Sequence, residues 1–399
     1  MANFPSLRLK KNEDRRIKQG HMWVFSNEVD TQFSPLKGFQ SGEQVIVEAS
    51  NGKPLGLAYI NPNNLICARI FSRDLKHELG LTFFKKRLQQ AQALRELNYD
   101  QPYYRLAFGE SDGLPGLVID RFNDVFVVQI GTAGMEAVKD DILQVLINLY
   151  HPRAVVWRND MASRELEGLE RYQTLAYGDL PEQLDVIENG VKFLVPALGG
   201  QKTGWFYDHR SARARMCELV KGKKVLDVFS YLGGWGIQAA VAGAESVACV
   251  DASESALEGV HVNAELNGVA DKVTSYQGNA FEVLTALTQQ LEKFDVVIVD
   301  PPAFVKRKKD IKAGSEGYRR INELAMRLVN PNGVLISASC SHHMSRAALI
   351  TQVQSAASHI DRTIQLFDQA YQAPDHPVHP AIPETEYLKT LFFRVSPRW

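Results

Sequence analysis

The stretch KKVLDVFSYLGGWGIQAAVAGAESVACVD, residues 223–251, decides the fold of the C-terminal half of the chain. An apolar run at 225–229 predicts a short strand, and a loop with three glycines follows at 230–236. Small side chains at 237–242 predict a helix, and 246–250 predicts a second buried strand. Glycine lacks a Cβ, so the loop backbone can approach a ligand, and the helix N-terminus offers free N–H groups. The stretch therefore predicts a strand–loop–helix–strand unit that binds a ligand.

Two classes of cofactor use such a unit. A dinucleotide site needs G-x-G-x-x-G directly after the strand, so that pyrophosphate meets the helix N-terminus. Here Gly233 comes late and Asp227 precedes the loop, where a carboxylate would repel pyrophosphate but suit a cationic amino-acid group. Asp251 ends the second strand, where it can accept both hydroxyls of a ribose. A structural βαβ unit without a nucleotide is the simpler alternative. The order D-V-F-S-Y-L-G-G-W-G resembles the first motif of S-adenosyl-L-methionine-dependent methyltransferases.

Composition sets the broad class. The chain has 399 residues, 45% of them hydrophobic and 23% charged, with a net charge of −1, which predicts two or three domains and only a local basic surface. No apolar run reaches membrane-spanning length, and the N-terminus lacks the apolar core of a signal peptide. The four cysteines are widely spaced and show no metal-ligand spacing. We expect a cytoplasmic protein with free thiols, without a membrane or metal partner.

Element patterns divide the chain into four parts. Residues 1–74 form a small β-rich module with strands at 44–48, 55–59 and 65–71, and residues 75–184 form a middle α/β domain with helices at 82–97 and 137–149. A hairpin at 185–195 turns at Asn189-Gly190. Strands and helices alternate in 196–399, which predicts an α/β fold with a mostly parallel, doubly wound seven-stranded sheet. The predicted strands are 225–229, 246–250, 273–277, 296–299, 334–338, 362–368 and 387–395.

The N-terminal module carries a local cluster of cations followed by aromatics. This order suits contact with RNA phosphates and stacking on bases. A solvated helix face that leads into a core strand is the alternative that composition alone favours. The pattern resembles the start of a PUA domain, an RNA-binding β-barrel, although Met22 stands where that family usually has proline. The candidate RNA-binding residues are Lys10, Lys11, Arg15, Arg16, His21 and Trp23.

Residues at the ends of neighbouring strands carry the predicted chemistry. Asp300-Pro301-Pro302 ends the fourth strand of the sheet, and this motif is common in methyltransferases that act on planar nitrogen groups. Cys340 follows the fifth strand. Cytosine C5 becomes nucleophilic only after a thiolate adds to C6, a step that also needs an acid at ring nitrogen N3. Cys340 and Asp300, at the ends of adjacent strands, supply both groups. His342 and His343 are candidates for RNA or cofactor contacts.

Taken together, these blocks resemble the bacterial 23S rRNA (cytosine-C5)-methyltransferase family, in which a PUA domain and a middle domain precede a class I, Rossmann-like methyltransferase domain. The motifs, in order, are G-H-x-W-V-F, E-S-D-G-L-P-G, K-T-G…D-H-R, the glycine loop, D-P-P-x-F, S-C-S and D-H-P-V…Y-L-K. The resemblance implies Cys340 as the nucleophile and Asp300 as the acid that orients the substrate. The E-S-D-G-L-P-G motif either contacts substrate or forms a rigid turn, and its turn-forming residues favour the turn.

The resemblance also implies the residues around S-adenosyl-L-methionine. The segment before the first helix would cover the methionine end of the cofactor, and Asn279 stands where relatives often carry an aspartate that binds adenine. For Phe281, a core position is the alternative. The predicted cofactor-binding residues are Gln201, Thr203, Gly204, Phe206, Asp208, Arg210, Asp227, Phe229, Ser230, Tyr231, Gly233, Gly234, Asp251, Ala252, Ser253, Asn279, Ala280, Phe281, Asp300 and Pro301.

Departures from the family pattern and two rival functions remain. Trp235 is expected to enlarge the glycine loop, and Ala303 stands where many 5-methylcytosine enzymes have a second cysteine. The chain could instead be an RNA N-methyltransferase acting on adenine or guanine, or a non-catalytic RNA-binding ribosome assembly factor. The expected partner is 23S rRNA or a large-subunit precursor, and the expected state is a monomer or homodimer.

Overall fold

The computed structural model describes residues 4–198 and 203–398, which pack into two units. The first unit consists of Met1–Leu184, Ala197–Trp205 and Pro374–Thr385. The second consists of Asp185–Pro196, Phe206–Ala373 and Glu386–Trp399. Two short segments beyond residue 196 thus pack with the N-terminal half. The division into a PUA-like part at 1–74 and a middle part at 75–184 stays our proposal.

A five-stranded sheet forms the N-terminal part of the first unit. Buried and partly exposed residues alternate along its strands, as in β3, where every second residue is buried, so one face of the sheet packs on the core. The short helix α1 (Arg15–Lys18) buries only Ile17 against this sheet. The strands are β1 (Ser6–Arg8), β2 (Trp23–Phe25), β3 (Gln44–Glu48), β4 (Pro54–Ile60) and β5 (Ile66–Ser72), in the order β1-β3-β4-β5-β2. The three strands predicted from the sequence are confirmed to within one residue.

A second five-stranded sheet forms the rest of the first unit. Its strands are β6 (Tyr103–Phe108), β7 (Leu117–Phe122), β8 (Val125–Ile130), β9 (Ala154–Asn159) and β10 (Tyr172–Gly178), in the order β10-β9-β8-β7-β6. The helices are α2 (Leu81–Glu96), α3 (Ala133–Glu136), α4 (Lys139–Tyr150) and α5 (Ser163–Leu166). The helix predicted at 82–97 is confirmed as α2. The one predicted at 137–149 corresponds to α4, which begins at Lys139, because the chain first forms the separate turn of α3.

The predicted hairpin is formed by β11 (Gln183–Glu188) and β12 (Val191–Pro196). Its two turn residues, Asn189 and Gly190, have φ angles of 53° and 80°. Positive φ at both central positions matches the right-handed twist of the strands, which is why Asn-Gly is favoured there.

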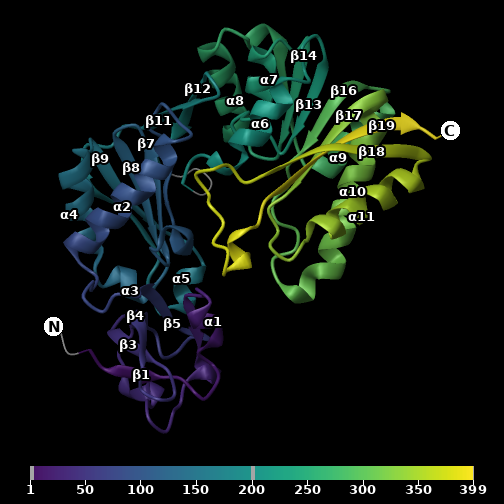
Figure 1. Ribbon diagram of the computed structural model, residues 1–399. Coiled ribbons are helices and arrows are strands. Elements are labelled where there is room, and N and C mark those ends of the chain that lie inside the picture. Colours follow the sequence, from purple (N-terminus) through teal and green to yellow (C-terminus); the bar gives the residue numbers. More distant parts are fainter. Residues whose placement is uncertain (1–3, 199–202, 399) are drawn as a thin grey trace. The chain divides into compact units, whose positions relative to one another are not determined.

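The second unit is built on a seven-stranded sheet, as predicted (Figure 1). The strand order is β15-β14-β13-β16-β17-β19-β18; β19 runs antiparallel to both of its neighbours, and the other pairs are parallel. The strands are β13 (Lys224–Val228), β14 (Ser246–Asp251), β15 (Val273–Gln277), β16 (Phe294–Val299), β17 (Val329–Ser339), β18 (Arg362–Tyr371) and β19 (Lys389–Pro397). The order reverses between β13 and β16, so ligands are expected beyond the carboxyl ends of these strands.

Helices cover both faces of this sheet (Figure 1). One group comprises α6 (Arg210–Cys217), α7 (Gly236–Val241) and α8 (Glu254–Leu266), and the other comprises α9 (Ala280–Gln289), α10 (Ile311–Leu328) and α11 (Arg346–His359). Successive residues of a strand point to opposite faces. Leu226 and Val228 of β13 therefore join the core beneath the second group, whereas Asp227 faces α7.

No helix among the described residues is both long and apolar enough to cross a membrane. Residues 4–198 and 203–398 also contain no group of three or more His, Cys, Asp or Glu side chains placed to hold a metal ion.

Candidate active site

The glycine loop leaves β13 through a strained backbone. Phe229 and Tyr231 have φ angles of 67° and 48°, in the left-handed region that bulky side chains rarely adopt. The N–H groups of Phe229 and Ser230 both donate to the carbonyl of Val250, at 2.9 and 3.0 Å, which ties the loop to the end of β14. Such strain costs of the order of 1 kcal/mol per residue and clusters at functional sites. The loop is therefore held in one defined conformation beside the point between β13 and β16 where the strand order reverses.

Two of the loop glycines make room for the protein's own side chains. A Cβ on Gly234 would lie 3.0 Å from the guanidinium carbon of Arg213, and one on Gly236 would lie 2.7 Å from Sγ of Cys249. These glycines therefore allow close packing of side chains behind the loop. Gly233 has a φ of 80°, which glycine adopts without strain.

Asp227 is fully buried beneath this loop. Its Oδ2 accepts the N–H of Gly236 at 2.8 Å, whereas its Oδ1 has no hydrogen-bond partner among the described residues. Burial raises the pKa of this carboxyl to about 7, and the hydrogen bond from Gly236 only partly offsets that effect. A partnerless buried carboxylate oxygen is the group that a ligand's ammonium would satisfy.

Asp251 lies at the end of β14 and is partly exposed. Its Oδ2 accepts the N–H of Tyr231 and its Oδ1 accepts the N–H of Ser253, both at 2.9 Å. Each carboxylate oxygen keeps a second lone pair for a ribose hydroxyl. Ala252 lies between these two anchors, and the Ser253 hydroxyl caps α8.

Asn279 begins α9. Its Oδ1 accepts the N–H of Phe281 at 3.0 Å as the helix N-cap, and Ala280 is the first helical residue. The ring of Phe281 packs on the core of the second unit and lies 6.3 Å from the ring of Phe304. The structure thus gives Phe281 a packing role, as the core alternative expected. The capping oxygen of Asn279 retains one lone pair for an adenine amino group.

The predicted segment before the first helix is divided between the two units. Gln201 lies outside the described residues. Thr203 and Gly204 belong to the first unit, where the buried Thr203 hydroxyl donates to Asp120 of β7. The Thr203 side chain is thus engaged by β7, and its predicted contact with cofactor stays a prediction.

Phe206, Asp208 and Arg210 belong to the second unit. The ring of Phe206 meets the ring of Tyr231 edge-on at 5.6 Å, which brings it to the glycine loop. Asp208 is buried and accepts a hydrogen bond from the hydroxyl of Tyr387, and Arg210 lies 3.7 Å from Glu188.

Asp300, at the end of β16, is the centre of a polar cluster. Its Oδ2 accepts hydrogen bonds from Nε2 of His209 and Nε1 of Trp235, each at 3.1 Å. Burial alone would raise the pKa of Asp300, but the imidazole of His209, assisted by Trp235 and Arg213, holds it below the ordinary value. Asp300 is therefore an anion at neutral pH.

Trp235 corrects one prediction. It does not enlarge the glycine loop, because its backbone is already helical at the N-cap of α7 and its side chain is only 2% exposed. The indole lies between α7 and the end of β16 and donates its N–H to Asp300. The ring of His209 lies against it at 5.4 Å.

A buried ion pair supports this cluster from behind. Arg213 lies over the Trp235 ring at 5.7 Å and pairs with the fully buried Glu188 at 2.8 Å. The amide of Gln238 donates to the same Glu188 oxygen at 2.8 Å. Neither Arg213 nor His209 was predicted from the sequence. The D-H-R motif included His209, but only its position beside Asp300 reveals its role.

Cys340 follows β17 directly and is partly exposed. The order of the sheet confirms that β16 and β17 are neighbours, with Val299 opposite Ser337. The thiol is flanked by a buried hydroxyl network, in which the Ser339 hydroxyl donates to Tyr318 at 2.8 Å and the Tyr318 hydroxyl lies 2.9 Å from that of Ser341. This network fixes the backbone on both sides of Cys340.

Lys389 is a third residue that sequence reasoning missed at this site, after Arg213 and His209. It begins β19, pairs with Ser339 across the ladder and donates from Nζ to the carbonyl of Ser341 at 2.7 Å. Burial lowers its pKa to about 8, an effect that the neighbouring Cys340 opposes, so Lys389 is largely cationic at neutral pH. A cation beside a thiol favours the reactive thiolate.

The loops after β16 and β17 are joined to each other. The N–H of Val305, in the D-P-P-A-F-V loop, donates to the Ser341 hydroxyl at 3.1 Å. Gly314 of α10 permits this arrangement, because a Cβ there would lie 2.6 Å from the carbonyl oxygen of Phe304. The loop that carries Asp300 and the loop that carries Cys340 are therefore locked together.

Several predicted RNA-binding side chains already have partners within the first unit. Arg16 pairs with Glu28 at 2.6 Å, and Nε1 of Trp23 donates to Glu110 at 2.7 Å. His21 accepts the N–H of Trp23 through Nδ1. Exposed positions are occupied by Lys10, Lys11 and Arg15.

The E-S-D-G turn is structurally engaged. Asp112 forms two hydrogen bonds with the buried Arg95, at 2.6 and 2.7 Å, and Gly113 has a φ of 69°. This geometry supports the expected rigid turn, although the same turn also lines a cavity, described below.

Comparison with known proteins gives the family and the fold. The profile of the S-adenosylmethionine-dependent methyltransferase family matches residues 170–394, and that of the PUA-like domain matches residues 7–73. A Streptococcus mutans protein described as an S-adenosylmethionine-dependent methyltransferase has the same fold, with a TM-score of 0.81 at 20% identity over 98% of this chain and 100% of its own. A methyltransferase solved with bound SAH gives a TM-score of 0.83 at 21% identity over 98% of this chain and 100% of its own.

Curated relatives match along almost the whole sequence. The chain is 38% identical over 395 residues to ribosomal RNA large subunit methyltransferase I of Aliivibrio fischeri, covering 98% of this chain and 99% of that protein. It is 38% identical over 397 residues to the protein of the same name from Klebsiella pneumoniae, covering 98% of each. A fully buried carboxylate under the glycine loop and a second acid one strand away fit S-adenosyl-L-methionine as the cofactor. The chain therefore belongs to the ribosomal RNA large subunit methyltransferase I family of S-adenosylmethionine-dependent methyltransferases.

Proposed function

We propose that this protein methylates C5 of a cytosine in large-subunit (23S) rRNA through a covalent bond between Cys340 and C6 of the base. The observation that carries the proposal is the placement of three groups. A partly exposed thiol follows β17, the anionic Asp300 follows the neighbouring β16, and the cationic Lys389 lies beside the thiol. The rRNA substrate is suggested by the names of the curated relatives and by the PUA-like N-terminal domain.

Each group has a defined task in the addition. The thiolate of Cys340, favoured by the ammonium of Lys389, adds to C6 and transfers electron density to C5. Asp300, as a carboxylate, accepts a hydrogen bond from the exocyclic amino group of cytosine and so orients the base, and it donates no proton to N3. S-adenosyl-L-methionine, when bound, supplies the sulfonium methyl group that C5 accepts. A base then takes the C5 proton, the electrons of that C–H bond form the C5–C6 double bond, and the Cys340 sulfur leaves C6 as a thiolate.

The cofactor contacts are part of the same proposal. Asp227 would receive the ammonium of the cofactor's methionine part, Asp251 its ribose, and Asn279 its adenine. The burial of Asp227 and its partnerless Oδ1 support the first of these assignments. The target cytosine must leave its stack to reach the strand ends, as in other enzymes that act on a base.

A trapping experiment tests the proposal. The substrate is 23S rRNA transcribed in vitro with 5-fluorocytidine in place of cytidine. It carries fluorine where the C5 proton must leave, so the adduct with the enzyme persists. We expect a complex that survives denaturing electrophoresis with the wild-type protein and not with Cys340→Ala. Cys217→Ala is the matched control, because burial raises the pKa of that partly buried thiol to about 11 and makes it a poor nucleophile.

Product analysis completes the test. The wild-type protein and Cys217→Ala should form 5-methylcytosine in ordinary rRNA, and Cys340→Ala should form none. Full turnover by Cys340→Ala would overturn the adduct mechanism, and a methylated adenine or guanine as product would favour the N-methyltransferase alternative.

A further inference from the structure

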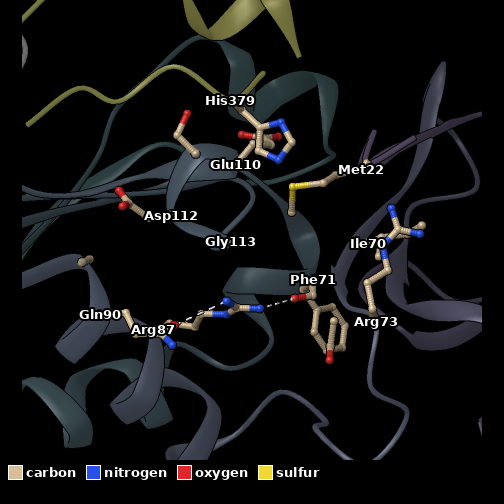
Figure 2. Close-up of a pocket in the computed structure, with 14 residues that line it drawn as sticks. Met22, Ile70, Phe71, Arg73, Arg87, Gln90, Glu110, Asp112, Gly113 and His379 are labelled. Atoms are coloured by element: carbon tan, nitrogen blue, oxygen red, sulfur yellow. Dashed lines mark hydrogen bonds between the residues drawn. The ribbon is translucent and has the colours of Figure 1, made fainter. Parts of the chain in front are cut away.

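The first unit contains a cavity that the methyl-transfer chemistry does not use. Its volume is about 370 Å³, within the range of small-ligand sites. The wall is formed by β5, helix α2, the E-S-D-G turn and the loop that carries His379 (Figure 2). The residues on which the argument depends are Met22, Phe71, Arg73, Arg87, Asp112 and His379.

The acidic residues of the wall are already neutralised. Glu110 accepts hydrogen bonds from Arg69 at 2.8 Å and from Trp23 at 2.7 Å. Asp112 forms its paired hydrogen bonds with Arg95, a fully buried residue. Neither acid is therefore left to balance a further cation in the wall.

Two arginines in the same wall lack an acidic partner. Arg73 donates to the carbonyls of Ile17 and His21, at 2.6 and 3.2 Å, and Arg87 donates to the carbonyl of Phe71 at 3.3 Å. Within residues 4–198 and 203–398, neither guanidinium pairs with a carboxylate. Burial lowers the pKa of both groups, and no anion offsets that cost. The cavity thus holds two uncompensated positive charges, which an anionic ligand would neutralise.

The E-S-D-G turn is shaped to accommodate one of these arginines. A Cβ on Gly113 would lie 3.1 Å from the guanidinium carbon of Arg87, at a backbone φ of 69° that disfavours side chains in any case. Figure 2 shows Arg87 beneath this turn and Arg73 on the opposite side of the cavity. The glycine of the motif therefore keeps the Arg87 guanidinium against the wall.

The rest of the wall combines a small apolar area with an imidazole. Met22 and Phe71 line the cavity but are only 8% and 2% exposed, so each presents little surface to a ligand. Nδ1 of His379 accepts the N–H of Ala381 at 3.2 Å, and burial lowers the pKa of this imidazole, so its Nε2 carries the remaining proton at neutral pH. Met22 is also the position where the chain departs from the usual proline of the PUA pattern.

We propose that this cavity binds one nucleotide of the RNA, with its phosphate on Arg73 and Arg87 and its base against Met22 and Phe71, within donor reach of His379. The proposal rests on the proposed function, because it takes RNA as the substrate. The nucleotide is distinct from the target cytosine, which must reach the strand ends of the second unit. The cavity therefore selects or positions the RNA, and the methyl transfer takes place elsewhere.

The test compares two double variants with the same charge loss. Arg73→Gln/Arg87→Gln removes both cavity cations. Lys85→Gln/Lys86→Gln removes two exposed cations of α2, the helix that carries Arg87, and neither lysine lines the cavity. Binding of in-vitro transcribed 23S rRNA is measured over a range of salt concentrations. We expect the arginine pair to weaken binding at least tenfold and to reduce the salt slope by about one, and the lysine pair to change affinity less than about twofold.

Further measurements separate this proposal from the proposed function. The arginine pair should leave the affinity for S-adenosyl-L-methionine and the kcat at saturating RNA unchanged. A failure to form 5-methylcytosine would overturn the proposed function without altering the binding comparison. Should the double variant fail to fold, Arg73→Gln alone, which leaves the hydrogen bond from Arg87 to Phe71 in place, carries the test with an expected loss of about threefold in affinity.

Three outcomes would overturn the RNA-nucleotide site. The first is an equal loss of affinity in the arginine and lysine pairs, which indicates general charge attraction. The second is unchanged RNA binding by the arginine pair. The third is saturable binding of CMP or inorganic phosphate that the arginine pair abolishes while RNA binding persists, which assigns the cavity to a free ligand.

Discussion

Asp227 lies near the end of β13 and Asp300 directly follows the neighbouring parallel strand β16; Asp227 is fully buried, whereas Asp300 is partly exposed. Their pKa values move in opposite directions. Burial raises the pKa of Asp227 to about 7, because one backbone N–H is its only hydrogen-bond partner in the described chain. Burial acts on Asp300 in the same sense, yet His209 and Trp235 outweigh it and hold its pKa below the ordinary value.

The difference shows how one sheet edge provides for two kinds of ligand. Asp300 receives its compensating donors from the protein, so it is charged before any substrate arrives. Asp227 lacks such donors, and its full ionisation depends on a cation brought by a ligand. In the proposed mechanism, the protein therefore stabilises the acid assigned to the substrate in advance, whereas the acid assigned to the cofactor is neutralised only when the ligand binds.

The largest expected effect comes from removing the negative charge of Asp300, which His209 and Trp235 stabilise. Asp300→Asn retains an oxygen for His209 and Trp235 but removes the anion that the substrate amino group meets. We expect the rate of RNA methylation to fall by about 10³-fold, while the affinity for S-adenosyl-L-methionine changes little. Single-turnover kinetics and calorimetry measure the two quantities separately. An equal loss of cofactor affinity would contradict the assignment of this acid to the substrate.

Removing the Asp227 carboxylate, which has few hydrogen-bond donors around it, should act mainly on stability. In the wild-type protein the folded pKa of Asp227 lies above its unfolded value, so stability falls as pH rises from about 4 to 7. Asp227→Asn removes this penalty and should stabilise the cofactor-free protein by up to about 4 kcal/mol at pH 8 and by almost nothing at pH 3.5.

Thermal unfolding without cofactor at several pH values checks this prediction. Asp251→Asn is the comparison variant, because it removes a carboxylate that is partly exposed and accepts two backbone N–H groups. The cofactor-free protein should also bind S-adenosyl-L-methionine more weakly after Asp227→Asn. A Tm difference that is the same at pH 4 and pH 8 would argue against the raised pKa.

The smallest expected effect comes from weakening the support of Asp300. His209→Gln keeps a hydrogen-bond donor but removes the imidazole that lowers the pKa of the carboxyl. Because the anion is the active form, the acidic limb of the pH–rate profile should move to higher pH, with at most a tenfold loss at pH 8. An unchanged acidic limb would mean that His209 serves only to pack against Trp235.

Much of the sheet followed from the sequence, for a physical reason. Strands of a parallel sheet are buried on both faces, so their apolar runs are long enough to recognise, and their carboxyl ends must meet at one edge. This rule placed Asp300 and Cys340 on adjacent strands, and the strand order confirms it. The Asn189-Gly190 turn was predicted because few other residue pairs tolerate its backbone angles.

The partners of these residues could not be predicted in the same way. His209 reaches Asp300 across 91 positions of sequence, and Lys389 reaches the Cys340 loop from a strand 48 residues beyond Ser341. Such pairings depend on side-chain direction and on packing between distant elements, which spacing in one sequence does not encode. Trp235 was misjudged for the same reason, since a large residue in a loop motif can point inward.

The hydrogen bond from Val305 to Ser341 has a mechanical consequence. It connects the loop after β16 to the loop after β17, and Gly314 of α10 packs closely against the backbone of Phe304 in the first of these loops. A displacement of the loop after β16 therefore acts directly on the loop after β17, because this hydrogen bond connects them. In the proposed mechanism, the connection restrains Asp300 and Cys340 before a base arrives and so lowers the reorganisation that the reaction requires.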